Sequence, residues 1–141
     1  MNVKKIVKYF PYTVFFISFI SLLISLYFSE IMKLPPCTLC WYQRIAMYPI
    51  VPVSIVGILL KDKKLPIYVL PLSISGMLLA FYHNLLVWGV IPESAAPCTV
   101  GVPCNVQQFV LYGFITIPLL SLISFAIITA LMVIYAKQVK K

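Results

Sequence analysis

Apolar residues fill four long stretches of this chain, and the polar residues gather in the short segments between them. Each stretch is long enough for an α-helix of the roughly 20 residues that cross a bilayer. Four prolines inside the stretches predict kinks, because neighbouring helices can satisfy the backbone groups that a proline frees. The pattern predicts an all-α membrane protein, a single domain over residues 1–141 whose four-transmembrane-helix bundle has spans at about 9–29, 41–60, 65–90 and 109–136.

Composition and charge agree with an integral membrane protein. Hydrophobic residues make up 62% of the chain and charged residues 10%, and the mean hydropathy is +1.04, which excludes an ordinary soluble domain. The basic start suggests a signal peptide, but no small-residue cleavage site follows it, so we expect a retained helix. Nine of the 11 Lys and Arg residues flank the spans on one side. This positive-inside pattern predicts that both termini are cytoplasmic, and it explains the net charge of +8 without a nucleic-acid partner.

All four cysteines lie in the two short loops predicted to face away from the cytoplasm: Cys37 and Cys40 in the first, Cys98 and Cys104 in the second. Disulfides persist in such an oxidising compartment. As passive disulfides, closed rings of four and seven residues would stabilise the fold by only about 1.9 and 2.4 kcal/mol. Passive disulfides and metal ligation remain alternatives, and redox activity is the favoured interpretation.

The first cysteine pair is well placed for thiolate chemistry. Two prolines precede it and a span begins just after it, so Cys40 should lie near a helix N-terminus, where free N–H groups and the helix dipole favour a thiolate. Arg44 follows one turn later on the same helical face, roughly 6 Å along the axis. Its alternative role is that of a cation snorkelling to the membrane interface, where Trp41 and Tyr42 are also expected.

Two segments carry a resemblance to a known family. Residues 36–44 read PCTLCWYQR in the first loop, and residues 98–104 read CTVGVPC in the second. Together with four spans, they closely resemble the DsbB family of disulfide bond formation proteins. The short chain and compact second segment are similar to the BdbC branch of thiol-disulfide oxidoreductases. The resemblance covers essentially the whole chain and implies a location in the bacterial cell membrane.

The resemblance implies an electron relay. A soluble extracytoplasmic thioredoxin-like oxidase of the DsbA or BdbD type would be reoxidised by exchange with Cys98 and Cys104, which supports disulfide formation in secreted proteins. Cys37 and Cys40 would pass the electrons to a membrane quinone, either menaquinone or ubiquinone. Cys40 would contact the quinone, and Arg44 would orient its ring and stabilise negative charge on its oxygens.

The second loop is short for such a relay. Fully extended, its cysteines would lie roughly 20 Å apart, whereas a disulfide needs Cα atoms about 5.5 to 6 Å apart. The segment must therefore turn back, and Gly101 and Pro103 are suitable turn residues. An intrapair disulfide is feasible, but little slack remains for Cys98 or Cys104 to swing toward Cys37.

Other residues and other functions complete the predictions. His83, in the outer part of the third span, is expected either beside the quinone or in an interhelical hydrogen bond. Glu30 and Glu93 are expected to be solvated loop residues. The alternative functions are a thiophilic-metal transporter, an accessory subunit with inert disulfides, and a relative of vitamin K epoxide reductase, in which the Cys-x-x-Cys follows the loop pair instead of preceding it.

Overall fold

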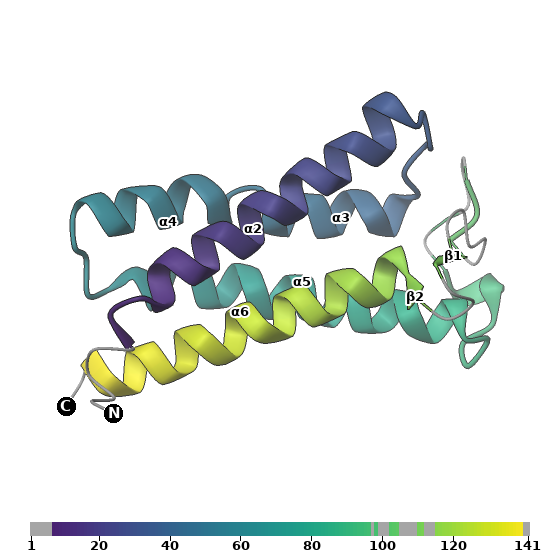
Figure 1. Ribbon diagram of the computed structural model, residues 1–141. Coiled ribbons are helices and arrows are strands. Elements are labelled where there is room, and N and C mark those ends of the chain that lie inside the picture. Colours follow the sequence, from purple (N-terminus) through teal and green to yellow (C-terminus); the bar gives the residue numbers. More distant parts are fainter. Residues whose placement is uncertain (1–6, 97, 99–101, 105–109, 112–114, 140–141) are drawn as a thin grey trace.

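The computed structural model describes residues 7–96, 98, 102–104, 110–111 and 115–139. Within these residues, four helical segments are long and apolar enough to cross a membrane: Phe10–Ile31, Thr38–Leu59, Leu65–Val87 and Ile117–Val139. They run alternately up and down the bundle (Figure 1). The predicted all-α, four-helix membrane fold is confirmed.

The first two spans are each built from two helical pieces. Helix α2 (Phe10–Leu26) continues as a π-helical turn, η1 (Tyr27–Ile31), and α3 (Thr38–Met47) is followed by α4 (Ile50–Leu59). The third span is the unbroken helix α5 (Leu65–Val87), and the fourth is α6 (Ile117–Val139). Between α5 and α6 lie a 3₁₀ turn, η2 (Glu93–Ala95), and the two-residue antiparallel strands β1 (Val110–Leu111) and β2 (Ile115–Thr116).

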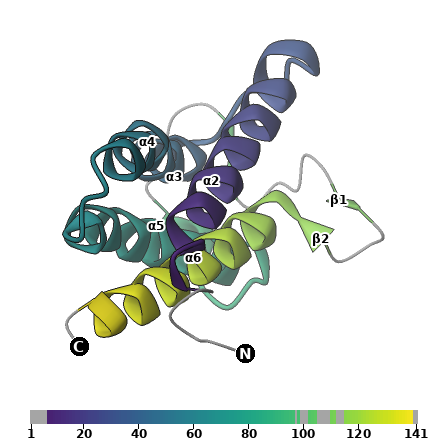
Figure 2. The same ribbon diagram turned by 60° about the vertical axis from the view of Figure 1, so that its left-hand side comes forward.

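The spans pack in neighbouring pairs. Helix α2 packs on α4 and α6, and α5 packs on α3, α4 and α6. Figure 2 shows this arrangement from a second direction. The central core contains Val14, Ile50, Val69, Phe125 and Ile128, all fully buried. The ring of Phe125 fills the space beside Gly76, where a Cβ would collide with it, so the glycine lets α5 and α6 approach closely.

Helix ends account for most differences from the predicted spans. Helix α5 ends at Val87, three residues early, because Gly89 adopts a positive φ of 71° and forms a Schellman-type turn, with the Val90 N–H donating to Leu85 O. Helix α6 begins at Ile117, where the Thr116 hydroxyl accepts from the Leu119 N–H and a proline occupies the first turn. The predicted start of this span, Phe109, lies outside the described residues.

The predicted proline kinks have three different outcomes. Pro49 lies at the junction where α3 ends and α4 begins, so the second span is interrupted there, and Pro52 falls in the first turn of α4. Pro71 lies inside α5, which remains one continuous helix. Pro118 falls in the first turn of α6, a position that needs no intrahelical N–H donor.

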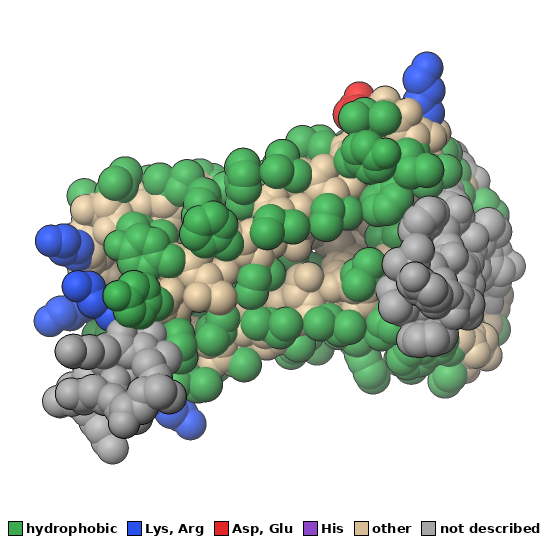
Figure 3. All heavy atoms as spheres, in the orientation of Figure 1, with side chains coloured by type: hydrophobic (Ala, Val, Ile, Leu, Met, Phe, Trp, Pro, Cys, Tyr) green, Lys and Arg blue, Asp and Glu red, His purple; other side chains and the backbone are tan. Residues whose placement is uncertain are grey.

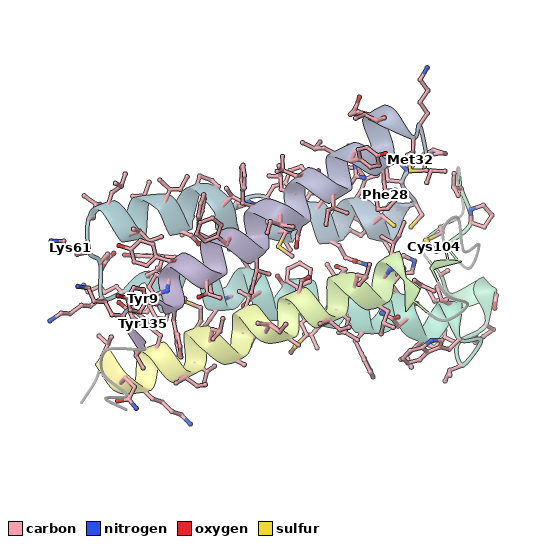
Figure 4. All side chains as sticks on the ribbon, viewed as in Figure 1. Tyr9, Phe28, Met32, Lys61, Cys104 and Tyr135 are labelled. Atoms are coloured by element: carbon pink, nitrogen blue, oxygen red, sulfur yellow. A yellow bond between two sulfur atoms is a disulfide. The ribbon has the colours of Figure 1, made fainter. Side chains whose placement is uncertain are left out.

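The two ends of the bundle differ in chemistry. Most of the Lys and Arg side chains in view gather at one end, a single one stands at the opposite end, and hydrophobic side chains cover the length between the ends (Figure 3). Tyr9, Lys61 and Tyr135 mark the basic end, whereas Met32 and Cys104 lie at the opposite end (Figure 4). Lys61 has a positive φ of 49° in the turn that joins α4 to α5. The cysteine loops and the lysine turn are therefore separated by the full length of the bundle.

Candidate functional site

A small apolar cluster supports the cysteine-bearing loops. It consists of Cys37, Leu39, Leu86, Ala96 and Cys104, all buried. The Tyr82 hydroxyl donates to Ala95 O over 2.8 Å and ties the second loop to α5. This contact therefore holds the start of the second loop against α5.

The second pair is joined by a disulfide between Cys98 and Cys104, with the two Cα atoms 5.9 Å apart. This confirms that the short segment turns back on itself. Pro103 lies within the described part of this turn, and Gly101 lies outside the described residues. The two sulfurs differ in exposure, because Cys104 is buried while Cys98 is half-buried. Cys98 is thus the one that a protein partner can reach more easily.

The first pair is present as two thiols. Cys37 is the N-cap of α3, where its Sγ accepts from the Cys40 backbone N–H over 3.3 Å. The sulfurs of Cys37 and Cys40 lie 2.9 Å apart, close enough for one thiol to donate to the other. In this structure the second pair is therefore a disulfide, and the first pair is two neighbouring thiols.

The contacts that stabilise a thiolate converge on Cys37, whereas the sequence predicts them at Cys40. The hydrogen bond from the Cys40 side chain has the largest effect, and it outweighs burial and lowers the pKa of Cys37 to about 4. The imidazole of His83 and the Cys40 backbone N–H also contribute to this lowering. Cys37, just ahead of the membrane-spanning helix, is thus the sulfur that carries the negative charge in this state.

His83 bridges the two loops and α3. Its Nδ1 lies 3.0 Å from Gln43 Nε2, and its Nε2 lies 3.1 Å from Cys104 O and 3.8 Å from Cys37 Sγ. Both His83 and Gln43 are buried. The interhelical hydrogen bond considered for His83 is confirmed, and it also reaches the backbone of the second loop.

One imidazole tautomer satisfies these contacts together. If the Gln43 amide N–H donates to Nδ1, that nitrogen must be unprotonated, and the proton of the neutral ring resides on Nε2. The Nε2–H then faces the Cys104 carbonyl and the Cys37 sulfur. Gln43 was missed as a site residue, although a polar side chain within an otherwise apolar span is a recognised signal for an inward-facing functional group.

The sulfurs of the two pairs are already neighbours. Cys37 Sγ, a ring nitrogen of His83 and Cys104 Sγ all lie within 4.8 Å of one another. The short second loop, which was expected to leave little slack, therefore needs no long swing to reach Cys37. Direct exchange between Cys104 and Cys37 requires a change in their separation of only a few ångströms.

Arg44 lies half-buried between two helices. Its Nη2 donates to Ser25 O of α2 over 3.0 Å, and its guanidinium carbon lies 5.4 Å from the centre of the Trp41 ring. This cation–π contact and the hydrogen bond hold the side chain in place. Glu30, in the adjacent π-helical turn, is exposed as predicted, and the Glu93 side chain lies outside the described part of the structure.

The low pKa of Cys37 leads to a test by pH titration. In a variant with Cys40→Ser, Cys98→Ser and Cys104→Ser, Cys37 is the sole thiol and the serine hydroxyl still donates to it. We expect the thiolate, followed by its ultraviolet absorbance, to persist well below the ordinary pKa of 9.0, because a depressed pKa keeps the group ionised as the pH falls. Replacing Cys40 with alanine in the same background should raise the midpoint. A midpoint near 9.0 in the serine variant would contradict the assignment.

Comparisons with known proteins identify the family of this chain. The family described as "Disulfide bond formation protein DsbB" matches residues 8–136. The chain is 43% identical over 123 residues to "Disulfide bond formation protein C" of Bacillus subtilis, covering 87% of this chain and 89% of that protein. It is 44% identical over 121 residues to "Probable disulfide formation protein C 2" of Bacillus cereus, covering 86% of each. No solved structure matches the chain.

The family match covers most of the chain, and both relatives are matched over more than two thirds of their length. The four apolar helices and the pairing of two cysteine loops at one end of the bundle suit the same class of protein. The chain therefore belongs to the DsbB family of disulfide bond formation proteins, and is a membrane oxidoreductase that generates protein disulfides.

Proposed function

We propose that this protein reoxidises an extracytoplasmic thioredoxin-like oxidase and passes the two electrons to a membrane quinone. The observation that carries the proposal is the contact between an oxidised and a reduced cysteine pair, in which Cys104 Sγ and Cys37 Sγ lie within 4.8 Å. Two passive disulfides would not need a shared, buried contact of this kind. The contact supports transfer of a disulfide from one pair to the other.

The exchange can be written with every bond balanced. A partner thiolate attacks Cys98, forms a mixed disulfide and releases Cys104 as a thiolate. Cys104 then attacks Cys37 of an oxidised first pair and displaces Cys40. The second partner thiol resolves the mixed disulfide and frees Cys98.

A final exchange completes the cycle within the protein. Cys98 attacks Cys104, restores the second disulfide and releases Cys37. The net result is an oxidised partner, an intact Cys98–Cys104 disulfide and a reduced first pair. The exposure of Cys98 and the burial of Cys104 support this order, because only the attacked sulfur needs to meet a protein partner.

The residues around Cys40 suit a quinone. A quinone presents carbonyl oxygens, which need donors, on a flat apolar ring. Arg44 has five N–H donors, one of which is bound to Ser25 O, and Cys40 lies one helical turn away. Trp41 and Tyr42 are exposed apolar neighbours. When bound, the quinone would accept two electrons and two protons as the Cys37–Cys40 disulfide is restored.

A direct assay tests the proposed function. Purified protein is mixed with a reduced thioredoxin-like dithiol and a soluble quinone analogue, and quinone absorbance is followed together with partner thiol content. We expect one quinone to be reduced for each partner disulfide formed. Partner oxidation with no quinone consumption over many turnovers would overturn the quinone proposal.

Arg44→Ala is expected to weaken quinone use by about 10- to 100-fold in kcat/KM, because it removes charged hydrogen-bond donors from the acceptor site. The kcat/KM of Arg44→Lys should lie between those of the wild type and Arg44→Ala, since lysine keeps the charge but not the planar guanidinium. Oxidation of a single equivalent of partner by the preformed Cys98–Cys104 disulfide serves as the control and should be unchanged. Wild-type kinetics in Arg44→Ala would leave the residue as an interfacial anchor.

The proposed function requires the cysteine end to lie outside the cytoplasm. In a cysteine-free variant, a thiol introduced by Lys33→Cys should react with a membrane-impermeant maleimide in intact cells. Lys63→Cys, at the opposite end and equally exposed, should react only after permeabilisation. The reverse labelling pattern would show the opposite orientation.

A further inference from the structure

Three buried metal-ligating side chains converge on one point at the cysteine end. Among the described residues, Cys37, His83 and Cys104 bring one sulfur, one ring nitrogen and one sulfur within 4.8 Å of each other. Their exposed fractions are 7%, 3% and 2%. They come from the N-cap of α3, from the interior of α5 and from the second loop, so the fold gathers them from distant parts of the chain.

The spacing suits a tetrahedral site for a thiophilic ion. Zn–S bonds of about 2.3 Å and Zn–N bonds of about 2.1 Å place a sulfur and a nitrogen on one tetrahedron about 3.6 Å apart. Cys37 Sγ and His83 Nε2 are 3.8 Å apart. Two thiolates and an imidazole are the donor set that selects Zn²⁺ or softer ions over Mg²⁺ and Ca²⁺. Cys40 offers a further sulfur donor, 2.9 Å from the sulfur of Cys37.

Gln43 supplies the outer support that a histidine ligand needs. A ligating imidazole usually donates its other N–H to an oxygen, which fixes the ring. Binding through Nε2 would place the remaining proton on Nδ1, which lies 3.0 Å from the Gln43 amide. A rotation of this amide by half a turn presents its oxygen to that proton. The Cys104 carbonyl would lose its contact with Nε2, and the Cys104 sulfur would hold the loop instead.

We propose that the fully reduced protein binds Zn²⁺ through Cys37, His83 and Cys104. Binding replaces the thiol protons of the two cysteines and changes no oxidation state. The Cys98–Cys104 disulfide removes one thiolate ligand, so oxidation of the second pair closes the site. If the relay proposed above is correct, the ion binds both the attacking sulfur of Cys104 and its target, the sulfur of Cys37. Bound Zn²⁺ then blocks the exchange between the two pairs.

The test uses purified full-length protein, reduced by a phosphine, with no quinone and no partner. Its outcome is therefore independent of the proposed function. Co²⁺ serves as the spectroscopic probe, and Zn²⁺ affinity is measured by competition with a chromophoric chelator. We expect one ion per protein, with visible bands of tetrahedral Co²⁺ and a thiolate-to-cobalt charge-transfer band. Oxidation of the second pair should abolish these bands.

Variants distinguish this site from chelation by any pair of cysteines. Cys104→Ser and His83→Ala should each weaken Zn²⁺ binding by more than about 100-fold, whereas Gln43→Ala, which keeps every ligand, should weaken it by about 10- to 100-fold. Cys98→Ser is the matched control and should bind like the wild type. Helix content by circular dichroism verifies that each variant is folded.

Three results would overturn the proposal. Octahedral Co²⁺ spectra would exclude the thiolate site, and wild-type affinity in a folded His83→Ala or His83→Gln variant would exclude the imidazole ligand. An equal loss in Cys98→Ser and Cys104→Ser would assign binding to the second pair alone.

Discussion

Replacing Cys104 with alanine is expected to trap a thioredoxin-like partner on Cys98 and to abolish continuous turnover. The variant lacks the thiol that would displace the partner from Cys98, so a mixed disulfide formed there cannot be passed on within the protein. The reagent is a partner that retains only its nucleophilic cysteine, activated as a mixed disulfide with a coloured aromatic thiol. Cys98 should release one equivalent of that thiol, and the complex should disappear on reduction.

Cys98→Ala is the matched control for this experiment. It retains Cys104, which is buried, whereas Cys98 is half-buried. We expect this variant to crosslink far more slowly, because the activated partner cannot reach the remaining loop sulfur. Equal crosslinking of the two variants, or a crosslink confined to Cys40, would reverse the assigned roles of the pairs.

Cys37→Ser is expected to stop continuous turnover while leaving one round of partner oxidation intact. The preformed Cys98–Cys104 disulfide can still oxidise one partner dithiol, but no disulfide remains for Cys104 to attack afterwards. Partner thiols and quinone absorbance are followed over many equivalents. We expect one partner oxidised per protein and no quinone reduced.

Serine is chosen at this position because it preserves a structural contact. Cys37 is the N-cap of α3, and alanine would cost about 1 kcal/mol of helix stability. A serine hydroxyl can accept from the Cys40 N–H in the same way, so loss of turnover is not caused by loss of the cap. Sustained quinone-dependent turnover in Cys37→Ser would contradict the two-pair relay.

The bundle could be predicted from the sequence because lipid imposes a simple rule. A helix must satisfy its own backbone hydrogen bonds, so apolar length alone located four spans. Boundaries were predicted less well where side chains decide them. The Thr116 cap sets the start of α6, and the positive φ of Gly89 sets the end of α5. At both places apolar residues continue past the helix end, so the hydrophobic pattern does not mark it.

The site was predicted only in part, for a related reason. Each cysteine pair could be recognised within its own short segment, and Arg44 lies in the first of them. The partners of His83, in contrast, come from α3 and from the second loop, 40 and 21 residues away along the chain. Such contacts depend on how helices rotate about their axes, which an almost uniformly apolar helix does not encode in its pattern. Gln43 was overlooked for this reason.

The second loop is anchored to His83 through the main chain of residue 104 and not through its sulfur. Every amino acid at that position offers the same carbonyl. The atom that positions the loop is therefore different from the atom that reacts. Natural variation or engineering at this position can therefore exchange the reactive group, for example a thiol for a selenol, and the bundle will still present it to the same neighbour.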